Sequence, residues 1–425
     1  MRFPLMALAF VLAASTVPAH AQGTPGVGPL TLAEALRLAE AASPAVRSRE
    51  AQLTAAEGYR QEAASLLYNN PQLNGDTTRR QPDAPVGSWN EWSAGITQPF
   101  EIGGQQARRR ELATAALEAL RAEIEDARRQ ARADASQRFH SVLAAQRRVH
   151  LEKRSVELFD SSAQAVAKRR NAGEDTRLDA NVALIEVERA RNALAVSLEH
   201  LQDAKAELAT ALQLPPSAVP EVIGDLAVPS GVTLPYSLEQ LLASAQAVPK
   251  QRALAAREDA ARARVGVERA SRYPDVTVGL NVGREGPGDG RERVTTLSLS
   301  VPLPLFKRND AAIGQALSEA TQAEIERASA TRDNQAQVRR LWSRLDSQRE
   351  RVARLQRAMV TASADNQQLA ARSRQAGQIG LLDQLLVNRQ ALDAERDLND
   401  ALADFHTTRI ELENAAGWSQ EGSSR

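Results

Sequence analysis

The longest regular pattern in this chain is helical. From Gln105 to Arg170 there is no proline or glycine, and apolar residues recur every three or four positions, as on one face of an α-helix. At ~1.5 Å per residue such a helix is a rod roughly 100 Å long, which no ordinary globular domain contains. The apolar positions form a narrow seam of mostly small side chains: Leu117, Leu120, Ile124, Ala127, Ala131, Ala135, Phe139 and Val142.

A second seam of the same spacing follows in the C-terminal half, at Val338, Leu341, Leu345, Val352, Leu355 and Met359. The remaining faces of both helices carry mainly arginine, glutamine, glutamate and aspartate. A narrow seam packs against one or two neighbouring helices but cannot build a thick core. Two arrangements fit this pattern, a solid antiparallel coiled coil and a hollow tube with a wet interior.

Segments of alternating polarity predict two pairs of β-strands. Residues 275–283 and 296–303 place valine and leucine on one face and small polar residues on the other, around a charged glycine-rich turn. Such a pair is typical of the wall of a transmembrane β-barrel, although a hairpin on a soluble domain has the same pattern. The apolar positions are Val276, Val278, Leu280, Val282, Leu297, Leu299, Val301 and Leu303. A weaker pair lies at 72–80 and 88–98, where Trp89 and Trp92 are expected at the level of the lipid headgroups.

The order of these elements occurs twice. Residues 170–194 align without a gap to residues 374–398, and the shared positions around a glycine turn are Arg170/Arg374, Ala172/Ala376, Gly173/Gly377, Leu178/Leu382 and Asp179/Asp383. We therefore divide the chain into a first repeat, 22–214, a proline-rich linker, 215–235, a second repeat, 236–417, and a C-terminal tail, 418–425. Each repeat is predicted to contain a helix interrupted at Pro44 or Pro249, two strands, a very long helix, a glycine turn and another helix.

Composition agrees with long helices and excludes several classes of function. Aromatic residues make up 4% of the chain and charged residues 25%, as in helices that meet through small side chains. Basic and acidic residues number 53 each, so no net field attracts nucleic acid. Residues 1–21 have the basic start, apolar run and small-x-small end of a Sec signal peptide, and we expect an exported chain. The absence of cysteine excludes disulfides and a lipid anchor on an N-terminal cysteine.

No combination of residues in the sequence indicates catalysis. The chain lacks a P-loop, a dinucleotide-binding glycine motif and a G-x-S-x-G nucleophile motif. Four histidines, His140, His150, His200 and His406, stand isolated on predicted helices, with no second ligand at the spacing of a metalloprotease motif. We therefore predict no enzyme activity, no catalytic residue, no cofactor and no metal site.

With their order repeated, these elements resemble the TolC-type outer-membrane factors of tripartite efflux systems, and within them the CzcC-like branch associated with heavy-metal efflux. The resemblance covers Leu30 to Gly417 and rests on the duplicated order, the signal peptide and the A-G-x5-D element that occurs twice. It implies a mainly α fold with a small transmembrane β part. Three subunits would close a twelve-stranded β-barrel in the outer membrane, and their helices would continue it as a periplasmic α-barrel. The far end would meet a periplasmic adaptor and, through it, an inner-membrane RND-type proton-driven pump.

The resemblance also assigns roles to residues at the glycine turns. The bends are expected at the periplasmic mouth of the tube, where the residues that dock the adaptor are Arg170, Ala172, Gly173, Leu178, Arg374, Ala376, Gly377 and Leu382. Asp179 and Asp383 are expected either to face the lumen as a pore constriction of six carboxylates in a trimer, or to cap the helix that each one begins. The two arginines either bridge neighbouring hairpins or are solvated.

The expected function is that of a passive exit duct in the outer membrane. The CzcC-like resemblance favours divalent heavy-metal cations. With no cysteine, and with only Met359 among methionines after the signal peptide, the chain lacks soft ligands to select them, so selection is assigned to the pump and adaptor. Two alternatives stay open: the exit channel of a type I protein secretion system, and a periplasmic coiled-coil scaffold without a pore.

Overall fold

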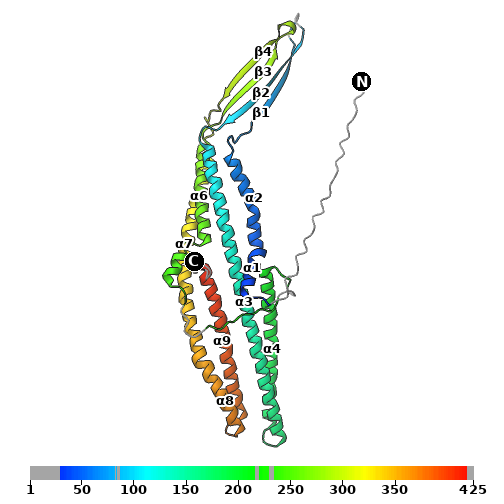
Figure 1. Ribbon diagram of the computed structural model, residues 1–425, viewed down its shortest axis with the longest axis vertical. Helices are drawn as coiled ribbons and strands as arrows, with labels where there is room; N and C mark the ends of the chain where they lie inside the picture. The colour runs from blue at the N-terminus through cyan, green and yellow to red at the C-terminus, as the bar shows by residue number, and fades with distance from the viewer. Residues whose placement is uncertain (1–28, 82, 84–86, 216–219, 229–233, 419–425) are drawn as a thin grey trace, which may run out of the picture.

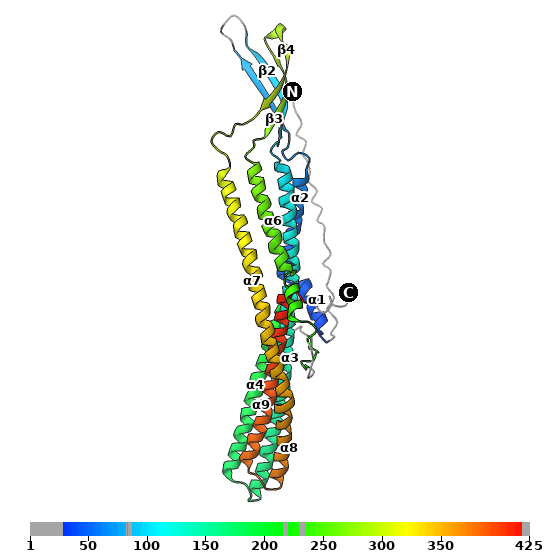
Figure 2. The ribbon, with the colours of Figure 1, turned by 90° about the vertical axis from the view of Figure 1, so that its left-hand side faces the viewer.

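The computed structural model describes residues 29–81, 83, 87–215, 220–228 and 234–418. The molecule is elongated, with a β-sheet at one end and long helices that run away from it (Figure 1). Figure 2 shows the lower parts of the long helices gathered at the end opposite the sheet. The predicted signal peptide, 1–21, and residues 419–425 of the predicted tail lie outside the described residues.

In the first half of the chain, two short helices precede a pair of strands and two long helices follow it. These elements are α1 (Leu32–Ala42), α2 (Pro44–Ala64), β1 (Gln72–Arg80), β2 (Trp89–Phe100), α3 (Gln105–Asn171) and α4 (Arg177–Leu212). The predicted uninterrupted helix is confirmed, because α3 contains 67 residues. Proline fits the first turn of a helix but not its interior, and Pro44 accordingly begins α2 directly after α1 ends.

The second half of the chain follows the same order. Its elements are α5 (Leu238–Ser244), α6 (Pro249–Ala270), β3 (Val276–Glu285), a 3-10 turn (Gly288–Gly290), β4 (Glu292–Ser300), α7 (Asp310–Arg354), a π-helical turn (Leu355–Val360), α8 (Thr361–Gln375) and α9 (Leu381–Ala416). The side-chain oxygens of Thr31 and Ser237 cap the first helix of each half. Between the halves, the described part of the predicted linker contains no helix, and its Val222 forms a parallel bridge with Leu30.

The four strands form one antiparallel sheet in the order β1-β2-β3-β4, so that the sheet joins the two halves of the chain. Directly paired residues lie on the same face of an antiparallel sheet. One row that crosses all four strands is Leu73, Ile96, Leu280 and Leu297, each at least 48% exposed. The neighbouring rows on the opposite face are small or polar. The sheet therefore has one apolar face and one polar face.

The limits predicted for the last strand, 296–303, are wrong. The charged residues of the predicted turn extend the strand pair at its start, so β4 begins and ends earlier in the chain. Val301 and Leu303, expected on the apolar face, lie beyond the end of the strand. Pro302 explains this early end, because proline has no N–H to donate to the neighbouring strand.

Buried apolar residues form three clusters along the helices instead of one central core. One cluster joins α1, α3 and α4, a second joins α5, α7 and α9, and a third joins α3, α4 and α9 closer to the turns. In the first predicted seam only Ala131 is half-buried, and the other seven residues are buried. In the part of the chain that is described, no helix is long and apolar enough to cross a membrane.

The second predicted seam is interrupted. Its first four residues are buried, but Leu355 is half-buried and Met359 is 41% exposed. A π-helical turn begins at Leu355, and the extra residue in such a turn rotates the following side chains around the helix axis. Leu355 still packs against the buried cluster of this seam, so the prediction is wrong only for Met359.

Buried ion pairs fix α9 against the helices of the first half. Glu152 of α3 is fully buried and accepts hydrogen bonds from Arg148 at 2.7 Å and from Arg396 of α9 at 2.9 Å. Glu186 of α4 is 4% exposed and accepts one from Arg389 of α9 at 2.8 Å. Because an unpaired buried charge is strongly unfavourable, these contacts specify which helix packs against which.

Leu345 gives a direct test of the clusters. It is fully buried between α5, α7 and α9, and we expect Leu345→Ala to destabilise the protein by about 2–5 kcal/mol through the cavity left behind. The measurement is thermal unfolding of the detergent-solubilised protein, followed by circular dichroism. Met359→Ala is the control, and a loss below ~1 kcal/mol is expected because that side chain is exposed. Equal losses in the two variants would contradict the interrupted seam.

Candidate functional site at the hairpin tips

The helices of each half turn back at the end of the molecule opposite the sheet (Figure 1). The first turn, residues 172–176, joins α3 to α4, and the second, residues 376–380, joins α8 to α9. We call these turns, with the first helical turns on either side, the two tips. They are in contact, because Arg374 Nη2 lies 3.0 Å from each carboxylate oxygen of Asp175.

Both tips have the same backbone geometry, and it requires glycine. Gly173 and Gly377 have φ angles of 83° and 72°. In each turn the amide after the glycine donates to a carbonyl five residues earlier, at 2.9 Å and 2.8 Å, which is the hydrogen bond of a Schellman cap. Ala172 and Ala376 are the helical C-cap residues just before. A Cβ at either glycine would meet no described atom within 4 Å, so backbone conformation and not crowding within the chain excludes other residues.

Asp179 and Asp383 both cap the helices that they begin. The Oδ2 atom of Asp179 accepts the backbone N–H of Thr176 at 2.9 Å, and that of Asp383 accepts the N–H of Gly380 at 3.1 Å. The hydroxyl and the N–H of Thr176 lower the pKa of Asp179, which therefore stays ionised at neutral pH. A capping carboxylate keeps free lone pairs, so capping is compatible with contact to a water-filled lumen.

The two matched arginines at the tips have different environments. The Arg374 side chain is 14% exposed and its partner Asp175 is 6% exposed. Arg374 Nη1 also donates to the carbonyl of Ile379 at 3.4 Å. By contrast, Arg170 is exposed, and its side chain makes no ion pair or hydrogen bond with the described residues. One chain thus contains a hairpin-to-hairpin ion pair at Arg374 and a solvated arginine at Arg170.

Sequence reasoning missed Asp175, which holds the tips together. Arg169 approaches the same carboxylate, with its Nε 3.4 Å from Oδ2. In the alignment of the repeats Asp175 is matched by Ile379, so an acidic residue is aligned with an apolar one two positions after the matched glycines. That mismatch is the signal that points to it. Its partner, 199 residues away in the chain, becomes visible only in the folded protein.

Large apolar side chains are exposed just after both tips. Leu178 is 70% exposed and Leu382 is 63% exposed, each in the first turn of its helix. Further along the same helices, Leu184, Ile185 and Leu386 are each more than 50% exposed. Exposed apolar side chains that gather in one region are typical of a surface that contacts another protein.

The expectation that the histidines are isolated is wrong for two of them. His140 of α3 and His406 of α9 stack with their ring centroids 4.7 Å apart. Their ring nitrogens contact the carbonyl oxygens of Ser136 at 2.7 Å and Leu226 at 3.1 Å. Burial lowers the pKa of both, and the pKa of His406 falls to about 4 with His140 beside it, so the rings are neutral at neutral pH. Among the described residues, no three His, Cys, Asp or Glu side chains gather as a metal site.

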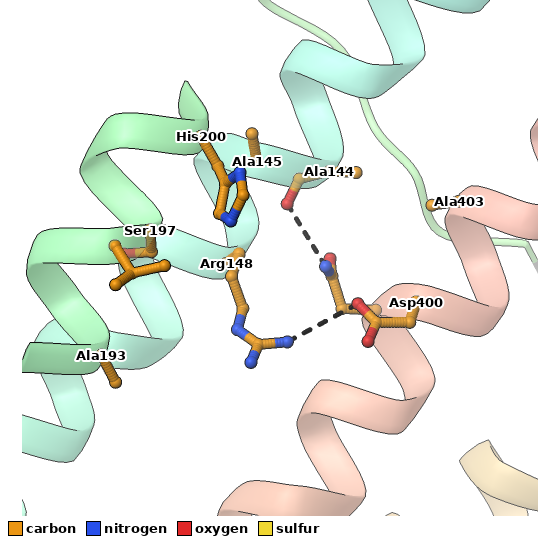
Figure 3. A pocket seen from close by; sticks show the side chains of 10 residues that line it. Ala144, Ala145, Arg148, Ala193, Ser197, His200, Asp400 and Ala403 are labelled. Atoms are coloured by element: carbon orange, nitrogen blue, oxygen red, sulfur yellow. Dashed lines mark hydrogen bonds and ion pairs between the residues drawn. The ribbon is translucent and has the colours of Figure 1, made fainter. Parts of the chain in front are cut away.

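A cavity of about 440 Å³ lies between α3, α4 and α9 (Figure 3). Four of its ten lining residues are alanine, and Arg148 and Asp400 form its charged side, where Nη1 and Oδ1 are 3.6 Å apart. The one hydroxyl in the lining, on Ser197, donates to the carbonyl of Leu194 at 2.8 Å and not to His200. This cavity therefore contains no nucleophile joined to a base.

Comparison with known proteins relates this architecture to a protein family. The chain matches the family model described as outer membrane efflux protein over residues 35–213 and again over 238–418. It is 30% identical over 308 residues to the cobalt-zinc-cadmium resistance protein CzcC of Cupriavidus metallidurans, a match that covers 70% of this chain and 69% of the relative.

Solved structures show the same fold. VceC of Vibrio cholerae has a TM-score of 0.76 at 18% identity, covering 91% of this chain and 96% of VceC. The open state of the MtrE outer-membrane channel of Neisseria gonorrhoeae has a TM-score of 0.74 at 18% identity, covering 91% of this chain and 89% of MtrE.

Long helices with narrow seams, paired tips and a small sheet with one apolar face together define a TolC-like channel fold, and the predicted mainly α fold is confirmed. The chain belongs to the outer membrane efflux protein family and is an efflux channel of the outer membrane, as the resemblance indicated. Members of this family are trimeric channel proteins and not enzymes.

The contact between the tips gives a second test. Because both side chains are largely buried, we expect Arg374→Ala to weaken the tips by about 1–3 kcal/mol. Amides of residues 374–380 should then exchange with deuterium roughly tenfold faster, or more, in mass-spectrometric exchange measurements. The matched variant Arg170→Ala should leave this exchange unchanged. Similar acceleration in both variants would show that the two arginines are equivalent after all.

Proposed function

We propose that three copies of this chain form the passive exit duct of a tripartite efflux system. The observation that carries the proposal is the pair of free edges on the sheet. Among the described strands, β1 and β4 each pair on one side only, and their unpaired backbone groups find no partners in lipid. Three copies of the four-stranded sheet, joined β1 to β4, would give a closed wall of twelve strands without an edge.

The two faces of the sheet suit this wall. The apolar face, with Leu280 and Leu297, would contact lipid, while the small and polar face would line a water-filled interior. At the base of the sheet, Phe306 is 97% exposed and Tyr273 is 60% exposed. Aromatic side chains are enriched at the membrane–water boundary, so these two residues support a boundary at that level.

The helices support the same assembly. Exposed apolar side chains on α4 and α9, among them Ile185 and Leu386, lie outside the three buried clusters of one chain. Neighbouring subunits would cover them and extend the wall as a tube into the periplasm. A helix as long as α3, with 67 residues, then gives this tube a length of roughly 100 Å.

We assign adaptor docking to the tips. Arg170, Leu178 and Leu382 support this role because they are exposed at the end of the molecule farthest from the sheet. The Schellman caps formed around Ala172, Gly173, Ala376 and Gly377 give both tips the same compact backbone for an adaptor hairpin to meet. Arg374 has a different role in this proposal: held by Asp175, it keeps the two hairpins in register. The adaptor would connect the duct to an inner-membrane RND-type pump.

Asp179 and Asp383 form the proposed pore constriction. They occupy matched positions just after the two tips, and three subunits would bring six of them to one level of the tube. A ring of carboxylates raises the local concentration of cations and lowers that of anions. The constriction would therefore favour cations without choosing between them.

We propose divalent heavy-metal cations as the substrate class. The relative CzcC is named for resistance to cobalt, zinc and cadmium. The chain has no cysteine, and the acidic constriction offers only hard oxygen ligands, which do not discriminate among these soft and borderline metals. Selection would then lie with the pump and the adaptor, and the duct itself would be passive.

Planar-bilayer recording tests the duct and its constriction together. The purified full-length protein is expected to give discrete conductance steps with a preference for cations. The double variant Asp179→Asn/Asp383→Asn should lose most of this preference, because the asparagine amide oxygen can still accept the N–H of Thr176 or Gly380 but carries no charge. Cation and anion permeabilities are measured from reversal potentials in a salt gradient.

The outcomes of that recording separate the two parts of the proposal. Absence of conductance steps for the unmodified protein would contradict the duct. Normal steps with unchanged cation preference in the double variant, and also in Asp179→Ala/Asp383→Ala, would contradict only the acidic constriction.

Substrate class is tested in cells that lack a functional exit duct but keep a metal-type pump and adaptor. Expression of this chain should raise tolerance to zinc, cobalt or cadmium severalfold, measured as the lowest metal concentration that stops growth. Tolerance to an organic dye should not change. Restored dye tolerance without metal tolerance would assign the duct to another substrate class.

A further inference from the structure

We propose that the outer end of the sheet binds the phosphate groups of anionic lipids through three arginines on its apolar face, Arg79, Arg284 and Arg293, which we call the arginine belt. The inference rests on the proposed function in one respect, namely that this face of the sheet stands against lipid. It adds a ligand, a lipid with an uncompensated phosphate, and a place where that ligand binds.

The register of the strands places the belt on the apolar face. Arg284 pairs directly with Arg293 of β4 and with Trp92 of β2. It lies four residues beyond Leu280 on the same strand, and residues separated by an even number share a face. Arg79 of β1 belongs to the next row of that face, beside the hairpin turn. All three arginines are exposed.

The belt also lies at the height expected for headgroups. From Val276 to Arg284 the strand rises roughly 26 Å at ~3.3 Å per residue, or about 20 Å along the membrane normal for a tilt of ~40°. The apolar band of a membrane-spanning sheet is ~25 Å tall. Trp92, in the same row as Arg284, is 49% exposed, and tryptophan is enriched at this boundary. Arg284 is near the end of β3, and β3 begins next to α6, so the belt lies at the end of the sheet away from the helices (Figure 1). It therefore meets the outer leaflet of the outer membrane.

On its own face the belt has no acidic partner among the side chains that the structure describes. Arg284 and Arg293 stand directly opposite each other and make no ion pair with the described side chains. Arg79 donates to the hydroxyl of Ser88 at 3.3 Å. Like charges directly opposite each other on a sheet are unfavourable unless an anion lies between them.

The carboxylates of the described strands lie on the opposite face of the sheet. There Arg80 binds Glu91 at 2.6 Å, and Glu91 also accepts the N–H of Gly286 at 3.1 Å. Glu285 and Glu292, the neighbours of the belt arginines in sequence, pair directly with each other on this polar face. Among the described strand residues, the carboxylates thus lie on the polar face and the charged residues of the apolar face are arginines, which leaves the balancing anion to the membrane.

The chemistry of the belt fits a lipid phosphate better than a free anion. A guanidinium offers two parallel N–H donors that match phosphate oxygens. The site is flat and continues below into Val282 and Leu280, against which acyl chains can lie. Belt arginines occur on both edge strands, β1 and β4, so closing the trimer would join three short belts into one.

The test uses the full-length protein in detergent with equal amounts of phosphatidylglycerol and phosphatidylcholine, and native mass spectrometry counts the lipids retained. We expect at least tenfold preference for phosphatidylglycerol, because each arginine near an anionic surface contributes about a factor of five. The triple variant Arg79→Gln/Arg284→Gln/Arg293→Gln should lose it, and the triple lysine variant should keep most of it. A matched control removes the same charge from exposed helix positions: Arg60→Gln/Arg339→Gln/Arg340→Gln.

Three results would overturn the inference: preference retained in the belt variant, equal loss in the helix control, or displacement of the lipid by millimolar inorganic phosphate. The last result would show a site for a free anion and not for a lipid. Conductance of the same preparations keeps this test separate from the proposed duct. A protein that forms no pore but loses its lipid preference only in the belt variant would refute the duct and support the belt.

Discussion

The free edges of the four-stranded sheet are the constraint on which the rest of this structure depends. Backbone N–H and C=O groups need partners wherever water is excluded, and one chain cannot supply them for β1 and β4. The helices also leave groups without partners, in this case apolar side chains. Their narrow seams are buried in three small clusters, but apolar residues after the tips stay exposed. Sheet and helices therefore leave the same kind of surface uncovered, which further copies of the chain would cover in the proposed assembly.

The two halves of the chain share their backbone requirements and differ in their side-chain contacts. Both tips have a positive-φ glycine, a Schellman cap and a capping aspartate. Only the first tip has Asp175, and only the second tip has an arginine that reaches across to it. The long helix of the first half is continuous, whereas that of the second half contains a π-helical turn. One chain thus contains two hairpins with the same backbone and different side-chain contacts.

The placement of charged residues differs between the faces of the sheet, the contacts between helices and the tips. In the sheet, carboxylates lie on the polar face and the unpaired arginines lie on the apolar face. Between the helices, buried carboxylates such as Glu152 are compensated by arginines of α9. At the tips, the capping carboxylates remain accessible to solvent. Each surface therefore carries the charge that its surroundings can balance.

The sequence by itself determined the elements and their faces: the long helix from Gln105, the alternation that gives the sheet an apolar side, the glycines that need positive φ and the order that identifies the family. These features depend on interactions between residues that are close in the sequence, so the pattern of residue types predicts them directly. The tertiary structure decided the contact of Arg374 with Asp175, the stacking of His140 on His406 and the break in the second seam. The two contacts join residues far apart in the chain, and the register of a helix across a π-turn is set by what it packs against. A local pattern contains neither kind of information, because both depend on how separate hairpins come together in space.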